Sequence, residues 1–376
     1  MRRLLILALA VAFALVPGTA HATNPALPIP SPLTASWTAP AGTYSPAPTD
    51  TVTSACNPCT VDLSAATITG SGTGYILKPA SGANVTLIGG TVSGMAGLVL
   101  GLVGTGGRAT VTITGTDTTN VVSGFLYKTN DGGRVDVTMT GVVGSGFGAG
   151  VHTYGSVTAS GNTLTGGGNP STGDPVGFKA DDLNTTGTPV PDQTFTVTGN
   201  TVTDFTSTGF QGDGAGAEET VWRAVVIGNT FGNESDASVD TKAQTTLVEG
   251  NTFLPNAAGS IRELAAHFGI TYSVGNTYTV QAGAGIEATA GAGPDPANPI
   301  YPGAVSNGDT FTLGTGSLIA KAQVACTGST GFTGPRTGFV ELDHPSWTSG
   351  GTPWATAPQQ CGGVPPTYAP VVNFRP

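Results

Sequence analysis

A short phrase recurs along most of the chain: about four β-favouring residues, then a glycine, then often Asn-Thr. It appears as VTLIGGT, VTITGTD, VTMTGVV, VTASGNT, FTVTGNT, VVIGNT, LVEGNT, YSVGNT and VSNGDT. The shared glycines are Gly89, Gly115, Gly141, Gly161, Gly199, Gly228, Gly250, Gly275 and Gly308, at intervals of 20 to 38 residues. Repeats of this length that are rich in Val, Thr and Phe and punctuated by Gly predict strand-turn-strand coils rather than helical repeats.

Asparagine follows five of these glycines, at equivalent positions of successive repeats. Asn tolerates left-handed backbone angles at turns, and its side chain can bond its neighbours along a stack. Each repeat therefore reads as one coil of a parallel β-solenoid. We expect a structural ladder of Asn162, Asn200, Asn229, Asn251 and Asn276.

The Gly-Asn-Thr repeats resemble the secreted right-handed parallel β-helix proteins of the pectate-lyase-like superfamily. The resemblance implies an all-β fold, a single-stranded right-handed parallel β-helix of about nine or ten coils over residues 61–321. Residues 23–60, rich in Pro and Thr, and the Pro-rich residues 322–376 are expected to cap the ends, which otherwise expose strand edges.

The N-terminus has the pattern of a secretory signal peptide, residues 1–22. Arg2 and Arg3 precede an apolar stretch at residues 4–16, and Ala20-His21-Ala22 follows a Pro-Gly pair. Cleavage after Ala22 would give a secreted protein. The apolar stretch is too short to span a bilayer, so we expect no membrane association.

Four cysteines form two couples that suit an oxidising compartment. We interpret both as structural disulfides, Cys56 with Cys59 and Cys326 with Cys361.

Charged residues make up only 10% of the chain, and 13 Lys+Arg against 23 Asp+Glu give a net charge of -10. A nucleic-acid-binding protein needs a basic face, so that class is excluded. Hydrophobic residues at 38%, alternating in short runs, argue against disorder. We expect a monomer without an organic cofactor.

The few charges gather on the strand that follows each Asn-Thr turn. Alternation places two outward columns there, whose neighbours lie about 4.8 Å apart. One column is His152, Lys179, Gln211, Asp240, Arg262 and Glu287, and the other is Tyr154, Asp181, Asp213, Lys242 and Leu264. Opposite charges on adjacent coils, such as Asp240 and Arg262, could simply stabilise the stack.

Long segments beside this strip, including residues 165–175, 182–193 and 214–223, suggest the walls of a binding site. Trp222 and Arg223 could form a sugar-stacking groove edge, with His152, Tyr154, Gln211 and Glu287 as further contacts to an extracellular polysaccharide.

The strip could cleave a uronic-acid polymer by β-elimination. Carboxylates Asp181, Asp213 and Asp240 could hold Ca²⁺, a hard cation that prefers oxygen ligands. Lys242 is the expected base, Lys179 the second choice, and Arg262 the partner of the substrate carboxylate. The run from Ser235 to Lys242 resembles the Asp-rich coil of calcium-dependent pectate-type lyases, and this resemblance adds Asp236 to the metal site.

Several alternatives remain open. His152 and Tyr154 could form another base and acid couple, as in β-helical uronate lyases and epimerases that work without a lysine. Paired carboxylates could hydrolyse a polysaccharide instead. A non-catalytic carbohydrate-binding or surface protein is also compatible with a solenoid. Thr-rich strands suggest ice binding, but intervals from 20 to 38 residues predict too irregular an array.

Overall fold

The structure, a computed structural model, describes most of the chain. The described residues are 24–45, 50–71, 74–121, 124–128, 132–146, 148–167, 175–180, 193–212, 223–256, 262–267, 269–289, 303–325, 336–348, 354–357 and 371–376. These residues form strands and connections without a helix, and so none of their segments is an apolar helix able to cross a membrane. The expected signal peptide, residues 1–22, lies outside the described residues.

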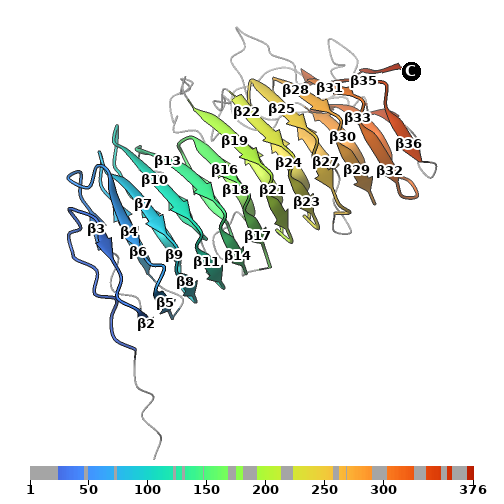
Figure 1. The fold of residues 1–376 in the computed structure, drawn as a ribbon. Coiled ribbons are helices and arrows are strands. Elements are labelled where there is room, and N and C mark those ends of the chain that lie inside the picture. The colour runs from blue at the N-terminus through green and yellow to red at the C-terminus, as the bar shows by residue number, and fades with distance from the viewer. Residues whose placement is uncertain are drawn as a thin grey trace, which may run out of the picture.

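The strands stack into three sheets that run along the solenoid (Figure 1). Sheet 1 contains β1 (Trp37–Thr38), β4 (Cys59–Asp62), β7 (Asn84–Ile88), β10 (Arg108–Thr114), β13 (Arg134–Thr140), β16 (Val157–Ser160), β19 (Thr194–Thr198), β22 (Arg223–Ile227), β25 (Thr245–Glu249), β28 (Ile270–Val274), β31 (Gly303–Asn307), β35 (Phe339–Asp343) and β38 (Val371–Arg375). Sheet 2 contains β2 (Gly42–Tyr44), β5 (Ala66–Thr69), β8 (Thr91–Ser93), β11 (Asp117–Thr119), β14 (Val143–Ser145), β17 (Thr163–Thr165), β20 (Thr201–Thr203), β23 (Thr230–Gly232), β26 (Thr252–Phe253), β29 (Thr277–Val280), β32 (Thr310–Leu313) and β36 (Ser346–Thr348). Sheet 3 contains β3 (Asp50–Val52), β6 (Tyr75–Pro79), β9 (Gly97–Gly101), β12 (Leu126–Lys128), β15 (Val151–Thr153), β18 (Val176–Ala180), β21 (Thr208–Gly212), β24 (Ala237–Thr241), β27 (Arg262–Ala266), β30 (Ala284–Thr289), β33 (Leu318–Ala325), β34 (Arg336–Thr337) and β37 (Trp354–Ala357).

Each coil contributes one strand to each sheet, and each strand pairs in parallel with the same strand of the next coil. The exception is β34, which pairs antiparallel to β33. The right-handed parallel β-helix is therefore confirmed. The stack is longer than expected, because residues 37–52 add β1, β2 and β3 at one end and residues 336–375 add strands at the other.

The core lies between the three sheets and changes character along the stack. Mostly aliphatic side chains fill it from β4 to β16, with Phe125, Met95 and Met139 among them, and aromatic rings are more frequent in later coils. Phe231, Phe253, Tyr278 and Phe311 stack face to face, with successive ring centroids 5.7, 4.4 and 4.8 Å apart. Near the start, Cys56 and Cys59 lie within disulfide distance, whereas Cys326 and Cys361 lie outside the described residues.

The expected Asn ladder is confirmed at the corner between sheets 1 and 2. Asn200 donates from its backbone N and from Nδ2 to Asn229 Oδ1, both at 2.9 Å, and Nδ2 also donates to Ala159 O at 3.1 Å. The same pattern recurs at Asn162, Asn229, Asn251 and Asn276. The preceding glycines adopt φ of 60° to 63°, a left-handed conformation that most side chains disfavour.

Asp309 takes the ladder position after Asn276. It accepts from Asn276 N at 2.6 Å and from the hydroxyls of Ser273 and Ser306, both at 2.6 Å. Burial raises the pKa of Asp309 and outweighs these hydrogen bonds, which act in the opposite direction. The ladder thus ends in a carboxyl group, which accepts hydrogen bonds but donates none while it is ionised.

Replacing Asn229 with Ala should destabilise the fold strongly. Asn200 N and Nδ2 would lose their acceptor inside the protein, at a cost of about 1–3 kcal/mol for each unsatisfied group. Denaturant unfolding checks the loss of free energy of unfolding. Asn307→Ala, at an exposed asparagine of β31, is the control, and equal stability of the two variants would contradict the role of the ladder.

A second polar cluster lies inside the coils, behind β24 and β27. Ser238 Oγ lies 3.1 Å from Glu234 Oε2, 3.2 Å from Asn256 Oδ1 and 3.0 Å from Glu263 Oε2. One hydroxyl proton cannot serve three acceptors, so the carboxyls must carry protons themselves. Burial raises the pKa of Glu234 and of Glu263 to about 8 each, so both are largely neutral at neutral pH.

This cluster should make the protein less stable in alkali. The folded pKa of about 8 lies above the ordinary value of 4.5, so the stabilisation is complete below pH about 4.5 and is lost as pH rises through about 8. Glu234→Gln should therefore flatten the fall in melting temperature between mildly acidic and alkaline buffer. Glu249→Gln, at an exposed position of β25, should follow the wild type. Parallel pH profiles for wild type and Glu234→Gln would contradict this prediction.

Candidate functional site

The outward face of sheet 3 carries the charged strip, which we define by its described residues: Tyr127, His152, Tyr154, Lys179, Gln211, Asp240, Lys242, His267, Glu287 and Lys321. The strand register places Tyr127, His152, Lys179, Gln211 and Asp240 opposite one another on consecutive coils. After Ala265 the column continues with Glu287 and Lys321. Asp181 and Asp213 lie outside the described residues.

The strip is not an ordinary solvated charged face. His152 and Lys179 are each 6% exposed, Asp240 is 5% exposed and Glu287 is fully buried. Ionic interactions are stronger in such surroundings than at an open surface, because water screens them less. Ion pairs within the strip are therefore screened less by water than those of an open surface ladder.

The register at β27 differs from the expected one by three residues. Val239 pairs with Leu264 rather than with Ile261, and Asp240 pairs with Ala265 rather than with Arg262. Leu264 is therefore fully buried in the core and does not belong to the outer column. A column of small inward residues would have identified this register, since it reads Ala180, Gly212, Thr241, Ala266, Ala288 and Ala322.

The shifted register brings His267, which the sequence analysis missed, into the second outer column beside Lys242. The backbone ladder extends one residue past the strands, because Lys242 N donates to Gly212 O and His267 N donates to Thr241 O, both at 3.0 Å. Lys242 and His267 therefore occupy equivalent positions on adjacent coils.

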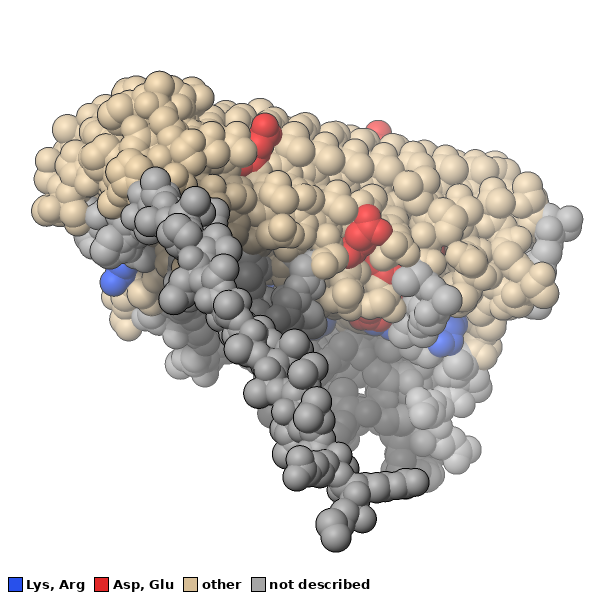
Figure 2. All heavy atoms as spheres, turned by 90° about the horizontal axis from the view of Figure 1, so that it is seen from below, with Lys and Arg blue, Asp and Glu red and all other residues tan. Residues whose placement is uncertain are grey.

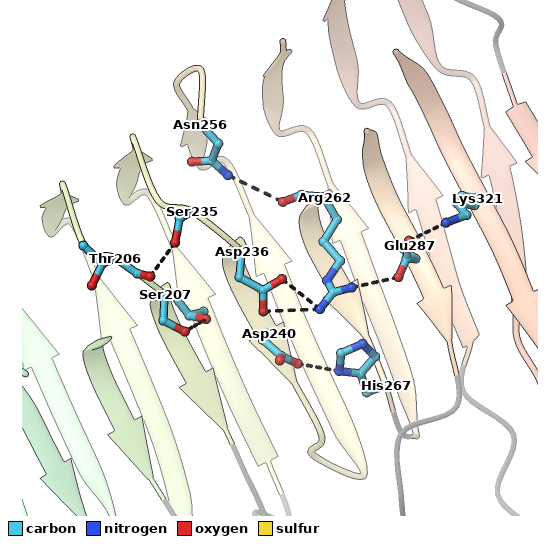
Figure 3. A network of polar contacts seen from close by, with 11 residues as sticks. Thr206, Ser207, Ser235, Asp236, Asp240, Asn256, Arg262, His267, Glu287 and Lys321 are labelled. Atoms are coloured by element: carbon cyan, nitrogen blue, oxygen red, sulfur yellow. Dashed lines mark hydrogen bonds and ion pairs between the residues drawn. The ribbon is translucent and has the colours of Figure 1, made fainter. Parts of the chain in front are cut away.

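Asp240 and His267 contact each other across adjacent coils, with His267 Nδ1 2.8 Å from Asp240 Oδ1 (Figure 3). Burial alone would raise the pKa of Asp240. The charge and hydrogen bond of His267 and the charges of Lys242 and Arg262 outweigh burial, and they hold this pKa well below its ordinary value. With Nδ1 engaged by a carboxylate, the neutral imidazole presents Nε2 as a proton acceptor.

Arg262 sits beside the strip in a second ionic network (Figure 3). Its Nη2 lies 3.1 Å from Asp236 Oδ1, and its Nη1 lies 3.0 Å from Glu287 Oε1. Lys321 Nζ lies 3.3 Å from the other oxygen of Glu287. This network joins four coils and balances the buried carboxylate of Glu287.

Aromatic rings occupy the N-terminal end of the strip. The rings of Tyr127 and His152 meet edge to face with centroids 5.4 Å apart, and those of His152 and Tyr154 lie 5.7 Å apart. Lys128 Nζ lies 5.8 Å from the centre of the Tyr154 ring. Arg223 is on another face, because it begins β22 of sheet 1 and is exposed. Trp222 lies outside the described residues.

Calcium binding stays a prediction, because two of the four expected ligands, Asp181 and Asp213, lie outside the described residues. Asp240 is engaged by His267, and Asp236 by Arg262. Nowhere in the described ranges do three or more His, Cys, Asp or Glu side chains gather to hold a metal ion.

Comparisons with models of protein families, with curated proteins and with solved structures found no match.

The Asp240–His267 pair should contribute a measurable coupling energy. A double-mutant cycle with Asp240→Asn and His267→Gln, followed by denaturant unfolding, should give about 0.5–3 kcal/mol. The matched control is the exposed pair Asp343 and His344, whose oxygen and nitrogen lie 3.0 Å apart and whose coupling should be near zero. Equal coupling in the two cycles would show that the buried setting adds nothing.

Proposed function

We propose that this protein is a secreted, polysaccharide-active member of the pectate-lyase-like superfamily, and that the charged strip is a lyase site for an acidic polysaccharide. The observation that carries the proposal is the buried Asp240–His267 pair beside Lys242 on the outer face of a right-handed β-helix. The signal-peptide pattern of residues 1–22 supports export to the compartment where such polymers occur.

The strip supplies the groups that β-elimination of a uronate requires. The ammonium groups of Lys179 and Lys242 attract the sugar carboxylate, and neutralising that carboxylate makes the adjacent C5 proton more acidic. His267 is our proposed base, because Asp240 orients the imidazole and stabilises the imidazolium formed when Nε2 takes the C5 proton.

The remaining steps of the elimination need no reactant other than the polymer and water. The electron pair of the broken C5–H bond forms a C4=C5 double bond, the C4–O bond to the leaving sugar breaks, and the leaving oxygen takes a proton from water. The products are an unsaturated uronide and a new reducing end. Tyr127, the partly exposed ring of the aromatic group, offers a surface to sugar units bound farther along the strip, and the buried ring of His152 supports it edge to face.

The test follows ultraviolet absorbance of the unsaturated product on pectate, alginate and glycosaminoglycans, with calcium and with a chelator. We expect absorbance to grow with one of these polymers. His267→Gln should lower the rate about 10²–10⁴-fold, the usual contribution of a general base. His344→Gln alters a histidine that also contacts an aspartate but is exposed at the far end of the stack, and it should leave the rate unchanged.

Three outcomes would overturn the lyase assignment. New reducing ends without absorbance would indicate a hydrolase. Polymer binding without either product would indicate a non-catalytic carbohydrate-binding protein. A His267→Gln variant as active as the wild type would remove His267 from the reaction.

A further inference from the structure

Sheet 2 presents two outward columns of hydroxyl side chains, which we call the hydroxyl face. The first column is Thr43, Thr67 and Thr91, then Asp117 and Val143, then Thr163, Thr201, Thr230, Thr252, Thr277, Thr310 and Ser346. The second column has Thr69, Ser93, Thr119, Ser145, Thr165 and Thr203 in succession, is interrupted at Gly232 and the exposed Leu254, and continues with Thr279, Thr312 and Thr348. Most first-column residues are exposed.

The strand register of sheet 2 is regular although the repeat length is not. From β7 to β36, two residues separate the end of each sheet 1 strand from the start of the next sheet 2 strand. The variable lengths lie elsewhere, between β17 and β18, β18 and β19, β21 and β22, and β30 and β31. The expectation that intervals of 20 to 38 residues spoil the array is therefore wrong, because they do not alter the register of sheet 2.

The hydroxyl face is almost free of charge, since Asp117 is the one charged residue in the twelve strands of sheet 2. Figure 1 places this sheet along the lower side of the solenoid, and the view from below in Figure 2 shows a long surface with few charged side chains. A high β-propensity could place threonine on any outer strand face. The outer face of sheet 1 also carries a threonine column: Thr60, Thr86, Thr112, Thr138, Thr158 and Thr196. That column continues as Val225, Leu247 and Tyr272, and Arg108, Arg134 and Asp136 lie beside it. The hydroxyl face differs because its hydroxyls continue to Ser346 and because it carries almost no charge.

The geometry suits a ligand that is itself a neutral, repeating lattice of hydrogen-bonding groups. Equivalent hydroxyls are about 4.8 Å apart between coils and about 6.6 Å apart between the columns. Hydroxyls hold ordered water, and the threonine methyls between them limit the positions water can take. The Asn ladder at one border of sheet 2 and the aromatic stack beneath it keep this spacing fixed.

We propose that the hydroxyl face binds ice. The coil spacing is close to the repeat between equivalent oxygens on the surfaces of hexagonal ice, so successive threonines can engage successive lattice positions. The low charge of the hydroxyl face suits an ice surface, because ice offers no counter-ions. The strong hydration of a charged side chain would also disturb the ice lattice. This surface is on a different sheet from the charged strip, and the inference does not depend on lyase activity.

A crystalline neutral polysaccharide is the main alternative ligand, since its surface also presents hydrogen-bonding groups at a regular repeat. Carbohydrate surfaces are commonly bound by aromatic rings whose faces stack on the sugars. Trp347, 40% exposed, is the large exposed aromatic among the described residues of sheet 2, and it lies at the end of the face. Along the hydroxyl face the rings of Phe231, Phe253 and Phe311 point into the core. The composition of the face therefore favours ice.

The test uses the purified protein in a nanolitre osmometer, where ice shape and the gap between freezing and melting are measured. We expect faceted ice crystals and a measurable thermal hysteresis, together with slower recrystallisation of polycrystalline ice. Thr201→Lys places a bulky cation in the middle of the first column and should abolish both effects. Thr245→Lys makes the same change at an exposed threonine of sheet 1 and should retain them.

Melting temperatures of the two variants, measured beside the wild type, show whether either change unfolds the protein. Thr201→Val, which keeps the shape but removes one hydroxyl, replaces Thr201→Lys if the lysine variant does not fold. Round ice crystals without hysteresis for the wild type would overturn the proposal. So would equal activity of folded Thr201→Lys and wild type, or sedimentation with insoluble cellulose or chitin in the absence of any effect on ice.

Discussion

The Asn ladder at the corner between sheets 1 and 2 is the interaction on which the rest of the architecture depends. Each ladder amide joins one coil to the next through its own backbone and through the neighbouring side chain. A slip of one residue would break several buried hydrogen bonds and turn core residues outward. Because the corner is constant, the chain can lengthen at the other corners while the stacked columns on sheets 2 and 3 stay aligned.

The wall formed by β24 and β27 separates two groups of carboxyls with opposite protonation. On its inner side Glu234 and Glu263 share hydrogen bonds with Ser238, and burial raises their pKa values. On its outer side nearby cationic groups keep Asp240 ionised despite its burial. Burial is common to both sides, so the difference comes from His267, Lys242 and Arg262, whose charges act on Asp240.

The sequence predicted the fold and the ladder because Gly-Asn-Thr marks the same corner in five coils. It underestimated the number of coils, since short strands such as Trp37–Thr38 and Gly42–Tyr44 lack that phrase. Alternation was enough to align His152, Lys179, Gln211 and Asp240. It was not enough at β27, where Ile261 and Leu264 are both apolar and only packing decides which one enters the core. The position of His267 depends on that choice, so the Asp240–His267 pair could not be derived from the pattern.

The termination of the ladder at Asp309 gives the stack a direction. Every ladder asparagine uses the side-chain oxygen of the next coil toward the C-terminus as its acceptor, and the run ends where a carboxyl replaces the amide and accepts from two serine hydroxyls. Coils inside the run are interchangeable in their hydrogen bonding, whereas the last is not. Duplication or loss of an internal coil would therefore preserve the pattern of hydrogen bonds at the corner. The molecule could change length during evolution while its terminal coil stayed the same.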